Sequence, residues 1–119
     1  MLRIGKERNQ VNVVCDQIGS PTYTADLAPL LCDMVVTEQY GTYHATNEGF
    51  CSWAEFATEI FRKAGYQTKV NFIPTSDYPT KAKRPFNSRM SKASLDVAGF
   101  QHLPQWQDAL QRYLEEIKA

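Results

Sequence analysis

The stretch at residues 16–28 holds the densest group of side chains that could bind a ligand. It reads Asp-Gln-Ile-Gly-Ser-Pro-Thr-Tyr-Thr-Ala-Asp-Leu-Ala. Gln17 and Thr22 supply a carboxamide and a hydroxyl that can hydrogen-bond a polar group. Gly19 relaxes the backbone between them, and Pro21 stiffens it. The alternative interpretation is a well-capped loop that binds nothing, because glycine, serine and proline are common turn residues.

A second group of side chains is basic. Five cations and no carboxylate lie between Asp77 and Asp96: Lys81, Lys83, Arg84, Arg89 and Lys92. Arginine suits a pyrophosphate because its guanidinium donates two parallel hydrogen bonds to oxyanions, and Pro85 restricts the backbone after Arg84. The alternative is a solvated loop of scattered charges. His44 is a candidate proton donor, although a lone histidine in a strand is commonly a hydrogen-bonded structural residue.

Hydrophobic periodicity predicts the elements that position these groups. We expect an α/β fold, a small mixed domain of three short strands at 11–15, 42–46 and 70–73 and four helices at 24–38, 52–64, 92–98 and 104–118. The stretch at 16–28 then lies where a strand leads into a helix. Ligands collect at such crossings in α/β proteins, because backbone N–H groups are unpaired there.

The helices carry further local signals. Ser52 and Glu55 form a predicted capping box before 52–64. The buried face of that helix is predicted to comprise Trp53, Phe56, Ala57, Ile60, Phe61 and Ala64. The last helix is predicted to begin at Pro104 and to bury Trp106, Ala109, Leu110, Tyr113, Leu114 and Ile117. Residues 1–9 are interpreted as the last turns of a helix whose beginning is missing, so we expect the sequence to be a piece of a longer chain.

Composition bounds the class of protein. The 119 residues carry 13 basic and 13 acidic side chains, so no overall field favours nucleic acid or an anionic membrane. The three cysteines form no CxxC pair, and their odd number argues against a complete disulfide framework. No apolar run spans a bilayer, and the first residues lack the apolar middle of a signal peptide. A cytoplasmic protein is expected.

Read as a string, residues 16–28 resemble the DQxGxPTYxxDLA signature of dTDP-4-dehydrorhamnose reductases. Three further segments at 41–49, 82–90 and 103–110 are similar to segments of that family. These enzymes are extended short-chain dehydrogenases that reduce dTDP-4-dehydro-L-rhamnose to dTDP-L-rhamnose with NADPH or NADH. The resemblance covers nearly the whole chain but only the C-terminal part of the family.

The resemblance implies that residues 1–119 are the substrate-binding lobe, with the NAD(P)-binding Rossmann domain absent from this chain. A dTDP-sugar would then be the substrate, bound by a set of five residues: Gln17, Gly19, Thr22, Arg84 and Arg89. No tyrosine here is followed four residues later by lysine, and no GxGxxG or GxxGxxG spacing occurs. The family's catalytic Tyr-x-x-x-Lys pair and cofactor-binding turn are therefore missing, and we expect no catalytic residue, no bound cofactor and no activity from the lobe alone.

Other interpretations stay open. Some relatives have lost catalysis and serve as regulatory subunits, so the chain could be an interaction module. The family also includes members that pair subunits through magnesium, for which Glu115 and Glu116 are candidates beside the simpler reading of solvated carboxylates. Without upstream strands, apolar surface on the first strand or first helix is expected to be exposed or covered by a second copy in a homodimer. A nucleic-acid role for residues 81–92 is disfavoured by the neutral charge.

Overall fold

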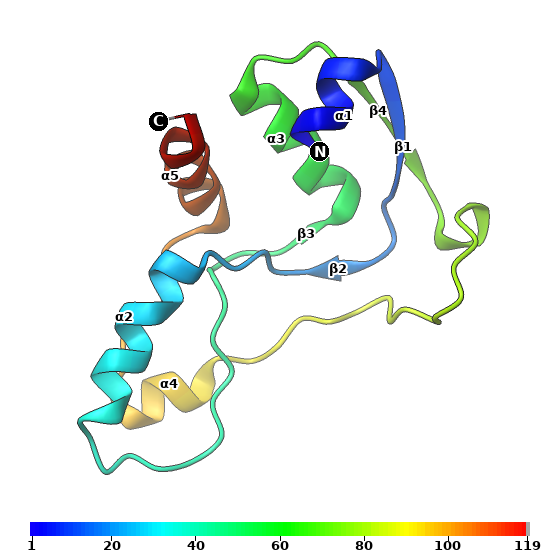
Figure 1. Cartoon of the computed structure of the whole chain (residues 1–119). Coiled ribbons are helices and arrows are strands. Elements are labelled where there is room, and N and C mark those ends of the chain that lie inside the picture. The colour runs from blue at the N-terminus through cyan, green and yellow to red at the C-terminus, as the bar shows by residue number, and fades with distance from the viewer. Residues whose placement is uncertain (119) are drawn as a thin grey trace. The chain divides into compact units, whose positions relative to one another are not determined.

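The computed structural model describes residues 1–118, which pack as two compact units (Figure 1). The first unit comprises residues 1–19 and 51–88 together with Lys118, and the second comprises residues 20–50 and 89–117. Each unit has its own apolar cluster. The chain therefore passes from one unit to the other after residues 19, 50 and 88.

The first unit is built on a strand, helix, strand arrangement. Strands β1 (Gln10–Val14) and β4 (Lys69–Ile73) are parallel, with Val11 paired to Val70 and Val14 to Ile73. Helix α3 (Trp53–Ala64) precedes β4 and packs on this sheet, where buried Val13, Ala54 and Ala57 form the cluster. The predicted strands at 11–15 and 70–73 are confirmed to within a residue.

Helix α3 begins and ends as predicted. The Glu55 N–H donates to Ser52 Oγ at 3.1 Å, and the Ser52 N–H donates to Glu55 Oε2 at 2.6 Å, which is the capping box. Gly65 ends the helix at φ 75°, a conformation that glycine adopts without a Cβ penalty. The prediction for Trp53 is wrong: its side chain is 58% exposed, and the neighbouring Ala54 takes the inward position with no exposed surface.

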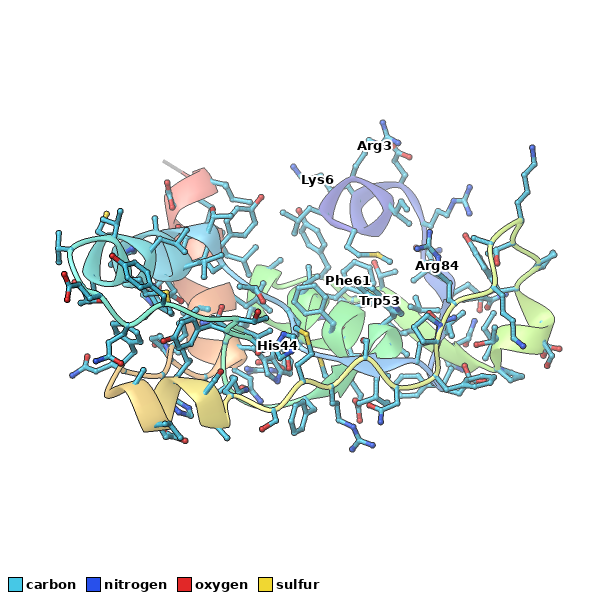
Figure 2. All side chains as sticks on the ribbon, turned by 90° about the horizontal axis from the view of Figure 1, so that it is seen from below. Arg3, Lys6, His44, Trp53, Phe61 and Arg84 are labelled. Carbon is cyan, nitrogen blue, oxygen red and sulfur yellow. The ribbon has the colours of Figure 1, made fainter. Side chains whose placement is uncertain are left out.

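Residues 1–9 contain the predicted helical segment, α1 (Leu2–Glu7). A Cβ at Gly5 would lie 2.7 Å from both Phe61 and Tyr66, so glycine permits the close approach of α1 to α3. Thr68 Oγ1 also donates to the Gly5 carbonyl at 2.8 Å. Figure 2 shows Phe61 beneath α1 and the side chains of Arg3 and Lys6 directed away from it.

Two short strands of the first unit were not predicted. β2 (Ile18–Gly19) pairs antiparallel with β3 (Cys51–Ser52), and Ile18 forms an isolated bridge with Asn87 on its other side. Strands of two residues are too short to give a hydrophobic period. They place residues 18–19 between two segments that are distant in the sequence.

The second unit centres on a cluster of buried leucines, Leu30, Leu95 and Leu103. Helices α2 (Thr24–Val35) and α4 (Ala93–Ala98) contribute the first two and lie side by side in Figure 1. Both predicted helices are present: α2 begins at position 24 as predicted but ends three residues before position 38, and α4 begins one residue after position 92 and ends at position 98 as predicted. Pro29 lies inside α2, where its missing N–H leaves one helical hydrogen bond unmade.

Helix α5 (Trp106–Lys118) starts two residues later than predicted. The Glu48 N–H donates to the Pro104 carbonyl at 2.9 Å, and the Trp106 N–H donates to the Glu48 carbonyl at 3.0 Å, so residues 104 and 105 are held extended. Trp106 and Leu110 are buried as predicted, but Tyr113 and Ile117 are 44% and 46% exposed and belong to the edge of the buried face.

The predicted strand at 42–46 is wrong. These residues pair with no strand among residues 1–118. Their alternation has another cause, because Tyr43 and Ala45 pack against the leucine cluster while His44 between them is exposed. The segment is extended without a ladder, and Figure 2 shows His44 on it.

The expected exposed apolar surface is found on the first long helix and not on the first strand. Val13 and Val14 are each only 8% exposed, whereas Leu31 and Val35 on α2 are 54% and 79% exposed. Leu31 and Val35 are four residues apart and so share one face of the helix. No helix within residues 1–118 has the length and apolar character needed to cross a bilayer.

Candidate functional site

The carboxyl ends of β1 and β4 meet at a group of polar side chains in the first unit. Both carboxylate oxygens of Asp16 accept from the Thr75 N–H at 3.0 Å, and Asp16 Oδ1 also accepts from Thr75 Oγ1 at 2.5 Å. Gln17 Nε2 donates to Thr75 Oγ1 at 3.2 Å. These bonds, the Thr75 hydroxyl first, hold the pKa of Asp16 below its usual value of 3.8.

Gly19 lies where a second segment approaches β2 closely. A Cβ at Gly19 would be 2.6 Å from Ser88 Oγ, a distance that real Cβ contacts do not show. The Ser88 N–H and hydroxyl both donate to the Ile18 carbonyl, at 2.9 and 3.1 Å. Glycine at position 19 is thus required for the packing of residue 88, which is a structural reason for its presence.

Arg84 belongs to the segment that follows the short 3-10 helix η1 (Thr75–Asp77). Its side chain is exposed, and within residues 1–118 its guanidinium has no ion-pair or hydrogen-bond partner. The Ile18 N–H donates to the Phe86 carbonyl at 2.9 Å, two residues after Arg84. The segment that carries Arg84 is therefore hydrogen-bonded to Ile18, which lies between Gln17 and Gly19.

The other two predicted site residues lie in the second unit. Thr22 Oγ1 donates only to the Ser20 carbonyl at 3.5 Å, which is a long bond, and the side chain is exposed. The Arg89 guanidinium carbon lies 5.7 Å from the centre of the Phe50 ring, in cation–π range.

Asp26 in the same sequence stretch has a structural role. Arg112 donates to both of its carboxylate oxygens, at 2.7 and 2.8 Å, and Asn47 Nδ2 donates at 2.8 Å. The hydrogen bonds from Arg112 lower the pKa of Asp26. Asn47 is fully buried and also bonds to the Tyr23 N–H and the Pro104 carbonyl. This network joins α2 to α5.

A second charged group was not found from the sequence. His102 Nδ1 lies 2.8 Å from Glu48 Oε1, and His102 Nε2 lies 2.6 Å from Asp96 Oδ1. Hydrogen bonds to Glu48 and then Asp96 raise the pKa of His102. Buried Lys92 Nζ lies 3.3 Å from the same Glu48 oxygen and 5.5 Å from the Phe50 ring centre. The only signal in the sequence was the Asn-Glu-Gly turn at 47–49.

The predicted acidic pair on α5 has separate partners. Glu115 Oε1 accepts from Gln111 at 2.7 Å, and Glu116 accepts from the Tyr23 hydroxyl. Across residues 1–118, no three histidine, cysteine or acidic side chains gather as a metal site would require. A magnesium ion shared between subunits stays a prediction.

The cysteines have no metal or disulfide partner in the described part of the chain. Cys15, Cys32 and Cys51 are all free thiols. Burial raises the pKa of the Cys51 thiol to about 11, so it remains protonated and unreactive at neutral pH.

Comparison with known proteins assigns the chain to a family. A family model described as the RmlD substrate binding domain matches residues 1–119. The chain belongs to this family. Among curated relatives of this RmlD substrate-binding domain, the spore coat polysaccharide biosynthesis protein SpsK of Bacillus subtilis is 40% identical over 98% of the chain, and a dTDP-4-dehydrorhamnose reductase of Aggregatibacter actinomycetemcomitans is 42% identical over 92%.

Solved structures agree with the family. A dTDP-4-dehydrorhamnose reductase from Bacillus anthracis in complex with NADP matches 97% of the RmlD domain chain with a TM-score of 0.90 and 43% identity. A reductase of the same name from Clostridium acetobutylicum matches 99% with a TM-score of 0.96 and 36% identity. The chain spans about two fifths of the length of these proteins, 40% and 42% respectively, and 40% and 42% of the two curated relatives. The predicted fold class and family are confirmed.

Proposed function

We propose that this chain is the C-terminal, substrate-binding portion of a dTDP-4-dehydrorhamnose reductase. The complete enzyme would reduce dTDP-4-dehydro-L-rhamnose to dTDP-L-rhamnose in dTDP-rhamnose biosynthesis. The observation that carries this proposal is the match of the RmlD substrate-binding family to every residue of the chain. The 42% identical relative, which bears the reductase name, supports the same reaction.

Of the five predicted residues, we propose that Gln17, Gly19 and Arg84 of the first unit contact the sugar nucleotide. Arg84 suits the pyrophosphate because its guanidinium is exposed and has no acidic partner within residues 1–118. Gln17 offers hydrogen bonds to uncharged ligand groups. Thr22 and Arg89 of the second unit stay predicted ligand residues. Gly19 contributes by allowing residues 86–88 to approach β2.

Cofactor chemistry is assigned to the part of the reductase outside this sequence. The Bacillus anthracis structure contains NADP, which supports NADPH or NADH as the hydride source of the whole enzyme. The 119 residues hold no glycine-rich turn and no Tyr-x-x-x-Lys pair. We therefore assign no residue of this chain to the cofactor or to proton transfer, and the chain alone is proposed to be inactive.

Calorimetric titration of dTDP and dTDP-rhamnose into the 119-residue chain tests substrate binding. Arg84→Ala should weaken binding of both by about tenfold or more, the cost of a charge-assisted hydrogen bond. Arg3→Ala is the matched control, because it removes an equally exposed cation of the same unit from α1. Equal affinities in all three proteins would contradict the assignment of Arg84.

A second candidate function is a regulatory or interaction module derived from the same family. The substrate-binding domain alone does not distinguish this module from the enzyme, because the glycine-rich turn and the Tyr-x-x-x-Lys pair that a reductase needs are not among the 119 residues. Oxidation of NADPH in the presence of dTDP-4-dehydro-L-rhamnose by the purified chain would refute the proposed inactivity. If the chain binds neither dTDP nor dTDP-rhamnose, the regulatory or interaction module is favoured.

A further inference from the structure

The Asp16 carboxylate determines the direction in which the Thr75 hydroxyl donates its hydrogen bond. An ionised carboxylate only accepts hydrogen bonds, and a hydroxyl has one proton to donate. At 2.5 Å from Asp16 Oδ1, the Thr75 hydroxyl must give that proton to Asp16. The same oxygen then presents only lone pairs to Gln17.

The Gln17 carboxamide is oriented as a consequence. Only its NH2 group can donate to the Thr75 oxygen, and Gln17 Nε2 lies 3.2 Å from it. The carbonyl oxygen of Gln17 is therefore turned away from Thr75, and no group of residues 1–118 donates a hydrogen bond to it, so it can accept one from a ligand. If the Thr75 proton pointed at Gln17 instead, the two ends of the amide would exchange places.

Thr75 is also the first residue of the segment 75–88, here named the basic loop for its lysines and arginine. Its N–H donates to Asp16, and residues 86 and 88 at the far end of the segment hydrogen-bond to Ile18. Residues 75–88 thus form a loop whose two ends are both held by residues 16–18. The loop carries three exposed cations, Lys81, Lys83 and Arg84.

We propose that Asp16 is a positioning residue, which acts through Thr75 to orient the Gln17 carboxamide and to hold the first end of the basic loop. This inference rests on the proposed function and deepens it. The loop cations would take the phosphates of the sugar nucleotide. The Gln17 carbonyl would accept from a hydrogen-bond donor on the same ligand, either a sugar hydroxyl or the N–H of the base.

Thr75→Val and Thr75→Ser form the matched pair that tests this. Valine keeps the branched shape and the backbone N–H bond to Asp16 but removes the hydroxyl, whereas serine restores the hydroxyl. We expect Thr75→Val to lower the affinity for dTDP-rhamnose about five- to tenfold, as the loss of one hydrogen bond does, and Thr75→Ser to retain it. An equal loss for dTDP assigns the donor to the thymidine part of the ligand, which carries the base N–H and the deoxyribose hydroxyl, and no loss for dTDP assigns a hydroxyl of rhamnose.

Asp16→Ala should weaken binding at least as much as Thr75→Val, because it removes the acceptor of the Thr75 N–H as well as that of the Thr75 hydroxyl. The double variant should bind no more weakly than Asp16→Ala alone, because Thr75 acts on Gln17 only together with Asp16. Additive losses would overturn the proposal, as would unchanged binding by Thr75→Val. If Asp16→Ala does not fold, the Thr75 pair decides alone.

The side-chain amide signals of Gln17 in NMR spectra of the ligand-free chain separate this proposal from the proposed function. A fixed carboxamide in the native chain and Thr75→Ser, and an averaged one in Thr75→Val, would support positioning by Thr75 even if no nucleotide binds. In that case the proposed function fails and the positioning role stands. An unchanged Gln17 signal in Thr75→Val overturns the positioning role.

Discussion

His102 contacts a carboxylate through each ring nitrogen, and this has a consequence for pH dependence. Only imidazolium has two N–H donors, so both contacts are hydrogen bonds when the ring is protonated. Because the folded-state pKa is raised above 6.5, protonated His102 stabilises the fold. This contribution is complete below pH 6.5 and is lost as the pH rises through the folded-state pKa.

We predict that the native chain loses more stability than His102→Gln between a pH below 6.5 and one well above it, because glutamine does not titrate. Urea unfolding at both pH values measures the difference. His44→Gln is the control, since His44 is exposed and has no hydrogen bond or ion pair within residues 1–118, and this variant should follow the native chain. If His102→Gln loses as much stability as the native chain over this pH range, the pH dependence arises from other groups.

Gly19 gives a second prediction at the scale of single residues. Gly19→Ala should destabilise the chain by about 1 kcal/mol, because Ser88 must turn away and give up its hydrogen bond to the Ile18 carbonyl. In the Ser88→Ala variant the methyl group added at position 19 meets no hydroxyl oxygen, so Gly19→Ala should lower the free energy of unfolding by less. The free energies of unfolding of the four proteins measure this coupling, and equal costs in both backgrounds would contradict it.

At the scale of elements, the pairing of Asp26 with Arg112 joins α2 to α5. The Asp26 side chain is 8% exposed and that of Arg112 is 38% exposed, so solvent screens the pair only in part. Arg112→Met should destabilise the chain by about 1 to 3 kcal/mol, because it leaves Asp26 charged and poorly solvated. Arg62→Met is the control: its pair with Glu59 on α3 leaves Arg62 65% exposed, and we expect a loss below about 0.5 kcal/mol. Thermal unfolding compares the two.

The sequence predicted the elements whose signals are local. The capping box at Ser52 and the left-handed glycines at 65 and 99 are set by neighbouring residues, and the helices they bound were correctly predicted. The strand at 42–46 was wrong because alternation reports which side chains are buried and not whether a neighbouring strand exists to pair with.

The candidate site was only partly predictable for the same reason. The string at 16–28 identified the stretch and the family, but Thr75 and Ser88 contact it from far along the chain. The Thr75 contact depends on the parallel register of β1 and β4, and the Ser88 contact lies beside the bridge between Ile18 and Asn87. No local pattern encodes either pairing. Asp26 was part of the recognised string, yet its partner Arg112 is 86 residues away.

At the scale of the whole molecule, the exposed face of α2 is the feature that predicts self-association. Leu31 and Val35 lie on one face of the helix and are more than half exposed. We predict a concentration-dependent dimer that Val35→Lys weakens, since a buried lysine loses its hydration. Gln39→Lys is the control, because it adds the same charge at an exposed position and should leave the dimer unchanged. Sedimentation velocity over a range of concentrations measures this, and a monomer throughout would contradict it.

The division of the chain into interleaved segments has one more consequence. Neither unit is a continuous stretch, because each is assembled from segments on both sides of the other. A protease that cuts the backbone once near residue 19, 50 or 88 would leave two further covalent connections between the units. Such a nicked protein should still elute from a sizing column at the position of the intact chain and separate into two pieces only in denaturant.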